Sequence, residues 1–168
     1  MWGLGAAWSG RAADGRRAIE QAVTLYESMG AKSLLSGYYV AWADALLLDG
    51  RAGEARGAAD RALELAVAYG ELANEAMALQ VLGEVAASQD SADLESAAVF
   101  CERGRSLAEQ LGLRSLLARG HLALGRLHQR MGQRQQAQES LSVARRMFSE
   151  MDMRFWLEQA ESALERLD

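Results

Sequence analysis

Apolar side chains recur along most of the chain at the three- and four-residue spacing that places them on one face of an α-helix. A clear example is the series Leu141, Ala144, Met147 and Phe148. The segments with this spacing are roughly 15 to 18 residues long, and a helix of about 16 residues extends about 24 Å. The pattern therefore predicts a succession of helices of similar length.

Glycine or aspartate stands between these segments at a regular interval of 20 residues, with a single interval of 22. The positions of this grid are Gly10, Gly30, Gly50, Gly70, Asp90, Gly112, Gly132 and Asp152. Both residue types tolerate the turn and left-handed conformations that end helices. Short turns reverse the chain, so neighbouring helices should run antiparallel. The grid predicts roughly nine helices, the first of them partial.

Similar motifs recur at twice this interval, which makes a pair of helices of about 40 to 42 residues the repeating unit. The best copy has a first helix with His121-x-x-Leu124-Gly125-x-x-His128 and a second with Ala137-x-x-x-Leu141. A glycine after leucine leaves a gap into which a neighbouring helix can pack closely. We therefore expect close helix contacts at Gly125 and at the equivalent Gly83, with small alanines opposite.

These motifs resemble the tetratricopeptide repeat, whose first helix carries Trp-x-x-Leu-Gly-x-x-Tyr and whose second carries Ala-x-x-x-Phe. The resemblance implies an all-α solenoid of antiparallel helix pairs. The units here lack the final proline and exceed the usual length, which is similar to the longer repeats in the C-terminal regions of large bacterial signalling ATPases, transcriptional activators and cyclase-linked regulators. The chain is thus expected to be the C-terminal part of a larger bacterial regulatory protein.

We expect one domain over residues 1–168, with a partial repeat in 1–30, repeats in 31–70, 71–112 and 113–152, and a capping helix in 153–168. The first helix begins about halfway along the repeat. Two interpretations follow: the chain is cut from a longer solenoid, or the incomplete edge is covered by a second subunit. In the second case Trp2, Leu4 and Trp8 would form a self-association surface and the protein would be a homodimer.

Composition and charge exclude several classes of function. The chain has 168 residues, no proline and 32 alanines, which favours helix throughout. Its 18 basic and 23 acidic residues give a net charge of −5, so we expect no nucleic-acid partner. No segment is long and apolar enough to span a membrane, so we expect no membrane partner. The single cysteine, Cys101, cannot form an internal disulfide, which indicates the cytoplasm.

Residues suited to catalysis are few. His121 and His128 lie seven residues apart at packing positions, and Cys101 stands where the repeat needs an apolar side chain. No glycine-rich phosphate loop and no nucleophile–histidine–acid set is evident. We therefore expect a protein that is not an enzyme and that has no metal site and no cofactor.

The resemblance places partner binding in a concave groove lined by the first helix of each pair. Carried onto this chain, the groove positions include Trp8, Asp44, Gln80, Glu84, Arg126 and Arg130, with Arg119 near the rim. The lysine and asparagine with which the family clamps a peptide C-terminal carboxylate are absent here. A receptor of that kind is therefore disfavoured, and the partner protein or peptide is of another type.

Charge is distributed unevenly along the chain. Residues 60–102 contain nine acids and one arginine, whereas residues 113–147 contain seven arginines and one glutamate. One interpretation is solvated helix surface. The other is a groove for a partner segment of mixed charge, in which Arg119, Arg126 and Arg130 pair with carboxylates while Asp44 and Glu84 meet basic residues.

Three functions remain open from the sequence. The leading one is a non-catalytic protein–protein interaction module. The alternatives are a homo-oligomerisation element at the N-terminal edge and a sensor that holds a small ligand in a pocket around Trp8, Tyr39 or Trp42.

Overall fold

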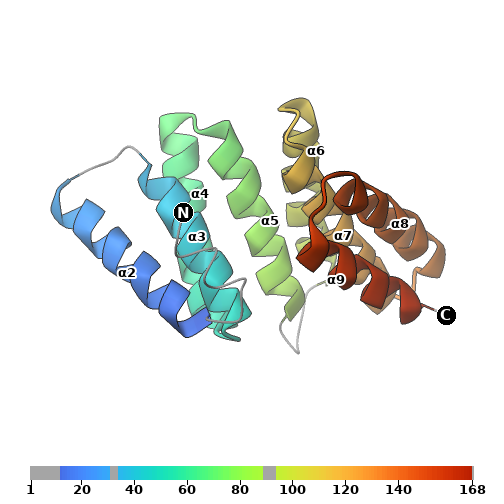
Figure 1. Cartoon of the computed structure of the whole chain (residues 1–168). Helices are drawn as coiled ribbons and strands as arrows, with labels where there is room; N and C mark the ends of the chain where they lie inside the picture. Colours follow the sequence, from blue (N-terminus) through green and yellow to red (C-terminus); the bar gives the residue numbers. More distant parts are fainter. Residues whose placement is uncertain (1–11, 31–33, 89–93, 168) are drawn as a thin grey trace.

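The computed structural model describes residues 12–30, 34–88 and 94–167. Every regular element in these ranges is an α-helix. The helices are α2 (Ala12–Ser28), α3 (Leu35–Leu48), α4 (Ala52–Tyr69), α5 (Leu72–Ser88), α6 (Leu94–Gln110), α7 (Arg114–Arg130), α8 (Arg134–Glu150) and α9 (Arg154–Glu165). Figure 1 shows the stack running from α2 at one end to α8 and α9 at the other, and each helix contacts the next one along the chain. The all-α, solenoid-like fold is confirmed, and the partial helix expected before Gly10 lies outside the described residues.

The turns fall where the grid predicts them. Gly30, Gly50, Gly70, Gly112 and Gly132 all have φ between 63° and 74°, and Asp152 has φ of 51°. At Gly70 this left-handed residue lets the next amide, that of Glu71, donate to the carbonyl of Ala66 at 2.8 Å. That bond satisfies a carbonyl at the end of α4 and is the standard glycine termination of a helix. Gly10 and Asp90 lie outside the described residues.

The helices form two layers. Helices α3, α5, α7 and α9 each contact the next member of this set, whereas α2, α4, α6 and α8 do not contact one another within the described residues. Helices that approach their second neighbours lie on the inside of a curved stack, so α3, α5, α7 and α9 form the inner layer and its concave face. The other four form the outer layer.

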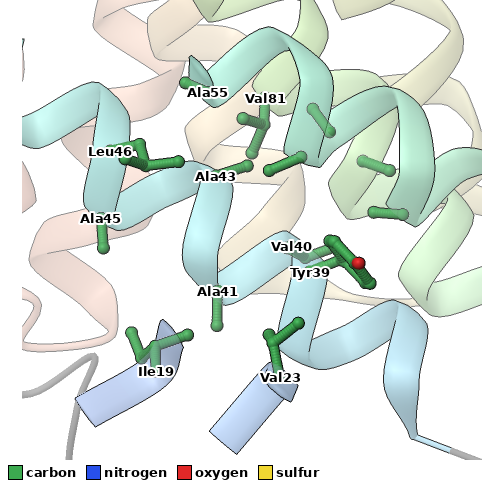
Figure 2. Close-up of a cluster of buried hydrophobic side chains, with 14 of the residues drawn as sticks. Ile19, Val23, Tyr39, Val40, Ala41, Ala43, Ala45, Leu46, Ala55 and Val81 are labelled. Carbon is green, nitrogen blue, oxygen red and sulfur yellow. The ribbon is translucent and has the colours of Figure 1, made fainter. Parts of the chain in front are cut away.

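Sequence explains which helix lies in which layer. Helix α3 carries buried residues on all sides, including Val40, Ala43 and Leu46, because its sequence is apolar all round. Figure 2 shows α3 between Ile19 and Val23 of α2 on one side and Val81 of α5 on the other. Outer helices bury one stripe only; in α8 it comprises Ala137, Leu141, Ala144 and Phe148.

Two glycines allow the close helix contacts that the repeat motif predicts. A Cβ atom added to Gly125 would lie 2.6 Å from Cγ of Leu141. At Gly83 it would collide with the Cys101 thiol and lie 3.1 Å from the carbonyl oxygen of Ala97. Glycine destabilises a helix by about 1 kcal/mol relative to alanine. At Gly83 the absence of a side chain allows the backbones of α5 and α6 to come into contact.

Helix α9 packs on α8 and is the last helix described. Ala160 and Ala163 are fully buried against α8, and Phe148 stacks on Trp156 with ring centroids 6.1 Å apart. Leu157 and Leu164 pack partly buried beside them. These apolar residues are thus the surface by which α9 packs on α8.

Candidate functional site

Three charged side chains meet at the centre of the concave face, one from each of three inner helices. Arg119 of α7 donates to both carboxylate oxygens of Asp44 of α3, at 3.1 and 3.3 Å, and to Oε1 of Glu84 of α5 at 3.5 Å. The side chains of Arg119 and Asp44 are only 12% and 9% exposed, and that of Glu84 is 25% exposed. We call Asp44, Glu84 and Arg119 the central ion cluster.

Arg119 is held on further sides. Its guanidinium carbon lies 4.7 Å from the ring centroid of Trp156 on α9, a cation–π contact. Burial acts to lower the pKa of Arg119, but the charges of Asp44 and Glu84 outweigh it and hold the pKa above its ordinary value. The guanidinium is therefore permanently charged, and it links α3, α5, α7 and α9 through one side chain.

Gln80 extends the central ion cluster along α5. Its amide donates to Oε1 of Glu84 at 3.1 Å, and the residue is fully buried. Two buried polar atoms here have no hydrogen-bond partner among the described residues, Oε1 of Gln80 and Nε of Arg119. The two carboxylates and one guanidinium leave the central ion cluster with a net charge of −1.

Two other arginines of α7 lie in a different environment. Arg126 is half-buried and donates to the amide oxygen of Gln159 on α9 at 2.7 Å, and burial lowers its pKa. Arg130 lies one turn further along and is exposed. Within the described part of the chain, neither guanidinium has a carboxylate within ion-pair distance. These two charges are therefore available to an outside group.

Arg126 and Arg130 border a cavity of about 280 Å³ between the inner helices, which we call the concave hollow. Side chains of α3, α5, α7 and α9 surround it, and the buried thiol of Cys101 on α6 lies at its floor. Burial raises the pKa of that thiol, which keeps it neutral. Its lining residues are Leu47, Gly83, Glu84, Ala87, Ser88, Cys101, Leu122, Ala123, Arg126, Leu127, Arg130 and Trp156.

The structure places six of the predicted groove residues on the inner helices and divides them. Asp44, Gln80, Glu84 and Arg119 meet in one buried network, whereas Arg126 and Arg130 border the concave hollow. Placing Arg119 near the rim was wrong, because its long side chain reaches inward to carboxylates on two neighbouring helices. The other predicted positions, Trp2, Leu4 and Trp8, lie outside the described residues.

Sequence reasoning missed the contribution of α9. Trp156 covers Arg119 and borders the concave hollow, and Gln159 accepts the hydrogen bond from Arg126. The grid contained the necessary information, since α9 follows the turn at Asp152 as α7 follows the turn at Gly112. That register assigns α9 to the inner layer.

A second hollow, of about 350 Å³, lies between α3 and α4 beside two of the aromatic residues singled out for a ligand sensor, Tyr39 and Trp42. Glu54 and Arg61 also line it. The Tyr39 hydroxyl donates to Glu27 at 2.7 Å, and burial together with that bond raises its pKa to about 12. The indole nitrogen of Trp42 is buried and has no partner among the described residues.

Comparison with known proteins adds no assignment: no family model matches the chain, and no curated protein matches it. Within the described ranges, no group of three or more His, Cys, Asp or Glu side chains could hold a metal ion. None of the helices described is both long and apolar enough to cross a membrane.

Proposed function

We propose that this chain is a non-catalytic protein–protein interaction module of the tetratricopeptide-repeat type, and that it holds a segment of a partner protein on its concave face. The observation that carries the proposal is the concave hollow, with a buried apolar floor and two guanidinium groups at its border. Binding sites combine apolar lining with a few placed polar groups in this way.

The surrounding structure supports a preformed site. A curved helical stack offers an extended inner surface to a partner, and here the central ion cluster ties α3, α5 and α7 together beside the hollow. The stacked helices need little rearrangement before a segment docks, which lowers the entropic cost of binding.

The proposal includes a cellular setting. The long helix-pair repeat, similar in style to those of bacterial signalling ATPases and transcriptional activators, supports a role in a bacterial regulatory protein. The buried free thiol of Cys101 supports a reducing compartment such as the cytoplasm.

Peptide selection followed by a blocking substitution tests this function. Peptides selected on the full chain from a phage-displayed random library should bind the free protein in fluorescence anisotropy. Ala87→Trp, which places an indole at the edge of the concave hollow, should abolish that binding. The matched control, Ala68→Trp on exposed α4 surface, should leave the Kd unchanged. Failure to select any peptide, or equal binding by both variants, would show that the function is not peptide binding in this hollow.

A small-ligand sensor is a second candidate, favoured by the hollow that Tyr39 and Trp42 line together with the charged residues Glu54 and Arg61. A library of water-soluble metabolites should then contain a compound that raises the Tm of the wild-type chain. Its effect should disappear in Arg61→Met, which removes a charged group that lines the hollow. A shift of equal size in both proteins would refute this site.

Self-association through Trp2, Leu4 and Trp8 stays a prediction. Light scattering after size-exclusion chromatography, at low and high salt, measures it. An apolar dimer should survive high salt, whereas a dimer in which the acidic residues 60–102 of one copy meet the basic residues 113–147 of another should dissociate.

A further inference from the structure

The charges on the concave face are not equally available to a partner. Arg119 is 12% exposed and already pairs with Asp44 and Glu84, and Asp44 is 9% exposed behind it. Oε1 of Glu84 accepts hydrogen bonds from both Arg119 and Gln80. A basic partner side chain would have to displace Arg119 to reach Asp44, which the buried geometry opposes. Glu84 lines the concave hollow and is 25% exposed, but its Oε1 is already engaged by Arg119 and Gln80.

Arg126 is in the opposite situation. It is half-buried, and its one hydrogen-bond acceptor in the described chain is the neutral amide of Gln159. The negative charge of Glu84 and the positive charge of Arg166 both act on it, but neither the Glu84 carboxylate nor another carboxylate of the described residues forms an ion pair with it. Removing a guanidinium from water without a carboxylate partner costs free energy. An incoming carboxylate would recover that cost and gain a charge-assisted hydrogen bond.

Arg130 lies one helical turn from Arg126 on the same face of α7, and it is exposed. Side chains at this spacing have Cβ atoms about 5–6 Å apart. The two guanidinium groups can therefore hold one carboxylate between them, or two carboxylates of a neighbouring segment. The apolar floor beneath them includes Leu122 and Leu127, which are 2% and 1% exposed, and Trp156 borders it.

We infer that the partner segment is acidic: it places one or two Asp or Glu side chains on Arg126 and Arg130 and inserts an apolar side chain into the concave hollow. This inference rests on the proposed function and replaces the partner of mixed charge that the sequence suggests, because Asp44 is buried against Arg119 and Glu84 already accepts hydrogen bonds from Arg119 and Gln80, whereas Arg126 and Arg130 pair with no carboxylate among the described residues. Because the chain lacks the lysine and asparagine that clamp a terminal carboxylate in the family it resembles, we assign the recognised carboxylates to side chains within the segment.

The test uses a phage-displayed library of random dodecapeptides joined to the coat protein through their C-termini, so that none has a free terminal carboxylate. Selection on the immobilised full chain should enrich Asp or Glu next to Leu, Ile, Met or Phe. Enrichment of Lys or Arg, or of apolar residues alone, would overturn the acidic assignment while leaving the proposed function intact. No enrichment at all would overturn both.

The strongest peptide, synthesised with acetylated and amidated ends, then gives Kd values by fluorescence anisotropy. Arg130→Gln and Arg126→Gln should each weaken binding by about tenfold or more, and Asp→Asn or Glu→Gln in the peptide should do the same. The matched control is the double substitution Arg145→Gln and Arg146→Gln on the exposed surface of α8, which should change the Kd by less than about twofold.

Two results would overturn the assignment at this stage. One is a peptide affinity that is insensitive to Arg130→Gln, a variant of an exposed residue that should fold even if Arg126→Gln does not. The other is a dimer of the free chain that Arg130→Gln dissociates, since the hollow would then hold a second copy of this protein.

Discussion

Arg119 and Arg126 lie on the same helix about two turns apart, and their surroundings differ completely. Arg119 pairs with two carboxylates and stacks on Trp156, whereas Arg126 meets only the amide oxygen of Gln159. One guanidinium therefore stabilises the contact between inner helices, and the other stands at the border of a hollow with unused charge. The two residues are of the same type and lie on the same helix. Their roles differ because the neighbouring helices present different side chains to them.

The largest expected effect comes from removing the charge of the central ion cluster. Arg119→Met leaves Asp44 and Glu84 buried without a counter-charge, so the free energy of unfolding should fall by about 3 kcal/mol or more. Urea denaturation monitored by circular dichroism measures the loss.

The matched control is Arg114→Met, which breaks an arginine–carboxylate bond of 2.6 Å to Glu150 in which both side chains are largely exposed. That substitution should cost at most about 1 kcal/mol. Equal losses for the two variants would mean that burial of the Arg119 pair adds nothing to stability.

The second prediction concerns Gly83, which lines the concave hollow where the backbones of α5 and α6 are in contact. Gly83→Ala forces a methyl group against Cys101 and the Ala97 carbonyl, so the free energy of unfolding should fall by about 1–3 kcal/mol. Gly57→Ala, on an exposed helix surface with nothing within 4 Å of the added Cβ, should instead raise it by up to about 1 kcal/mol. Thermal unfolding of both variants would reveal whether the signs are opposite.

A smaller effect on stability is expected when pH changes the charge of Glu71, whose carboxylate is hydrogen-bonded to side chains of α3 and α5. Ser36 and Asn74 donate hydrogen bonds to the Glu71 carboxylate, and these bonds hold its pKa below the ordinary value. The resulting stabilisation is complete above the unfolded-state pKa, about 4.3, and is lost as pH falls through the lower folded-state pKa.

Glu71→Gln should therefore lower stability at neutral pH, and its difference from wild type should shrink on acidification. Urea titrations at neutral and acidic pH measure the two differences. A difference that is constant with pH would contradict the assigned role of the carboxylate.

Sequence pattern was sufficient for the succession of helices and for their turns. Apolar spacing and left-handed glycines are local properties, so Gly50 or Gly132 can be placed without knowledge of the rest of the chain. The close helix contact at Gly83 was also predictable, because the repeat motif has a glycine at the position where the neighbouring helix packs.

The sequence did not predict which charged residues of the concave face pair with one another and which lie at the border of the hollow. Asp44 and Arg119 are 75 residues apart, and whether their side chains meet depends on the spacing and crossing of three inner helices. A position in the repeat assigns a residue to a face but does not define how far a long arginine side chain reaches across it. For the same reason the sequence did not reveal that Trp156 and Gln159 of α9 contact Arg119 and Arg126 of α7.

The smallest expected change, that of Arg126→Met, distinguishes the two arginines most clearly. Arg126 has no carboxylate to leave unpaired, so replacing it should leave the free energy of unfolding unchanged or raise it by up to about 1 kcal/mol. The most direct test is urea unfolding of Arg119→Met and Arg126→Met measured side by side. We predict a loss of about 3 kcal/mol or more for the first and no loss for the second. Equal losses, or a larger loss for Arg126→Met, would contradict the assignment of one arginine to the fold and the other to a partner.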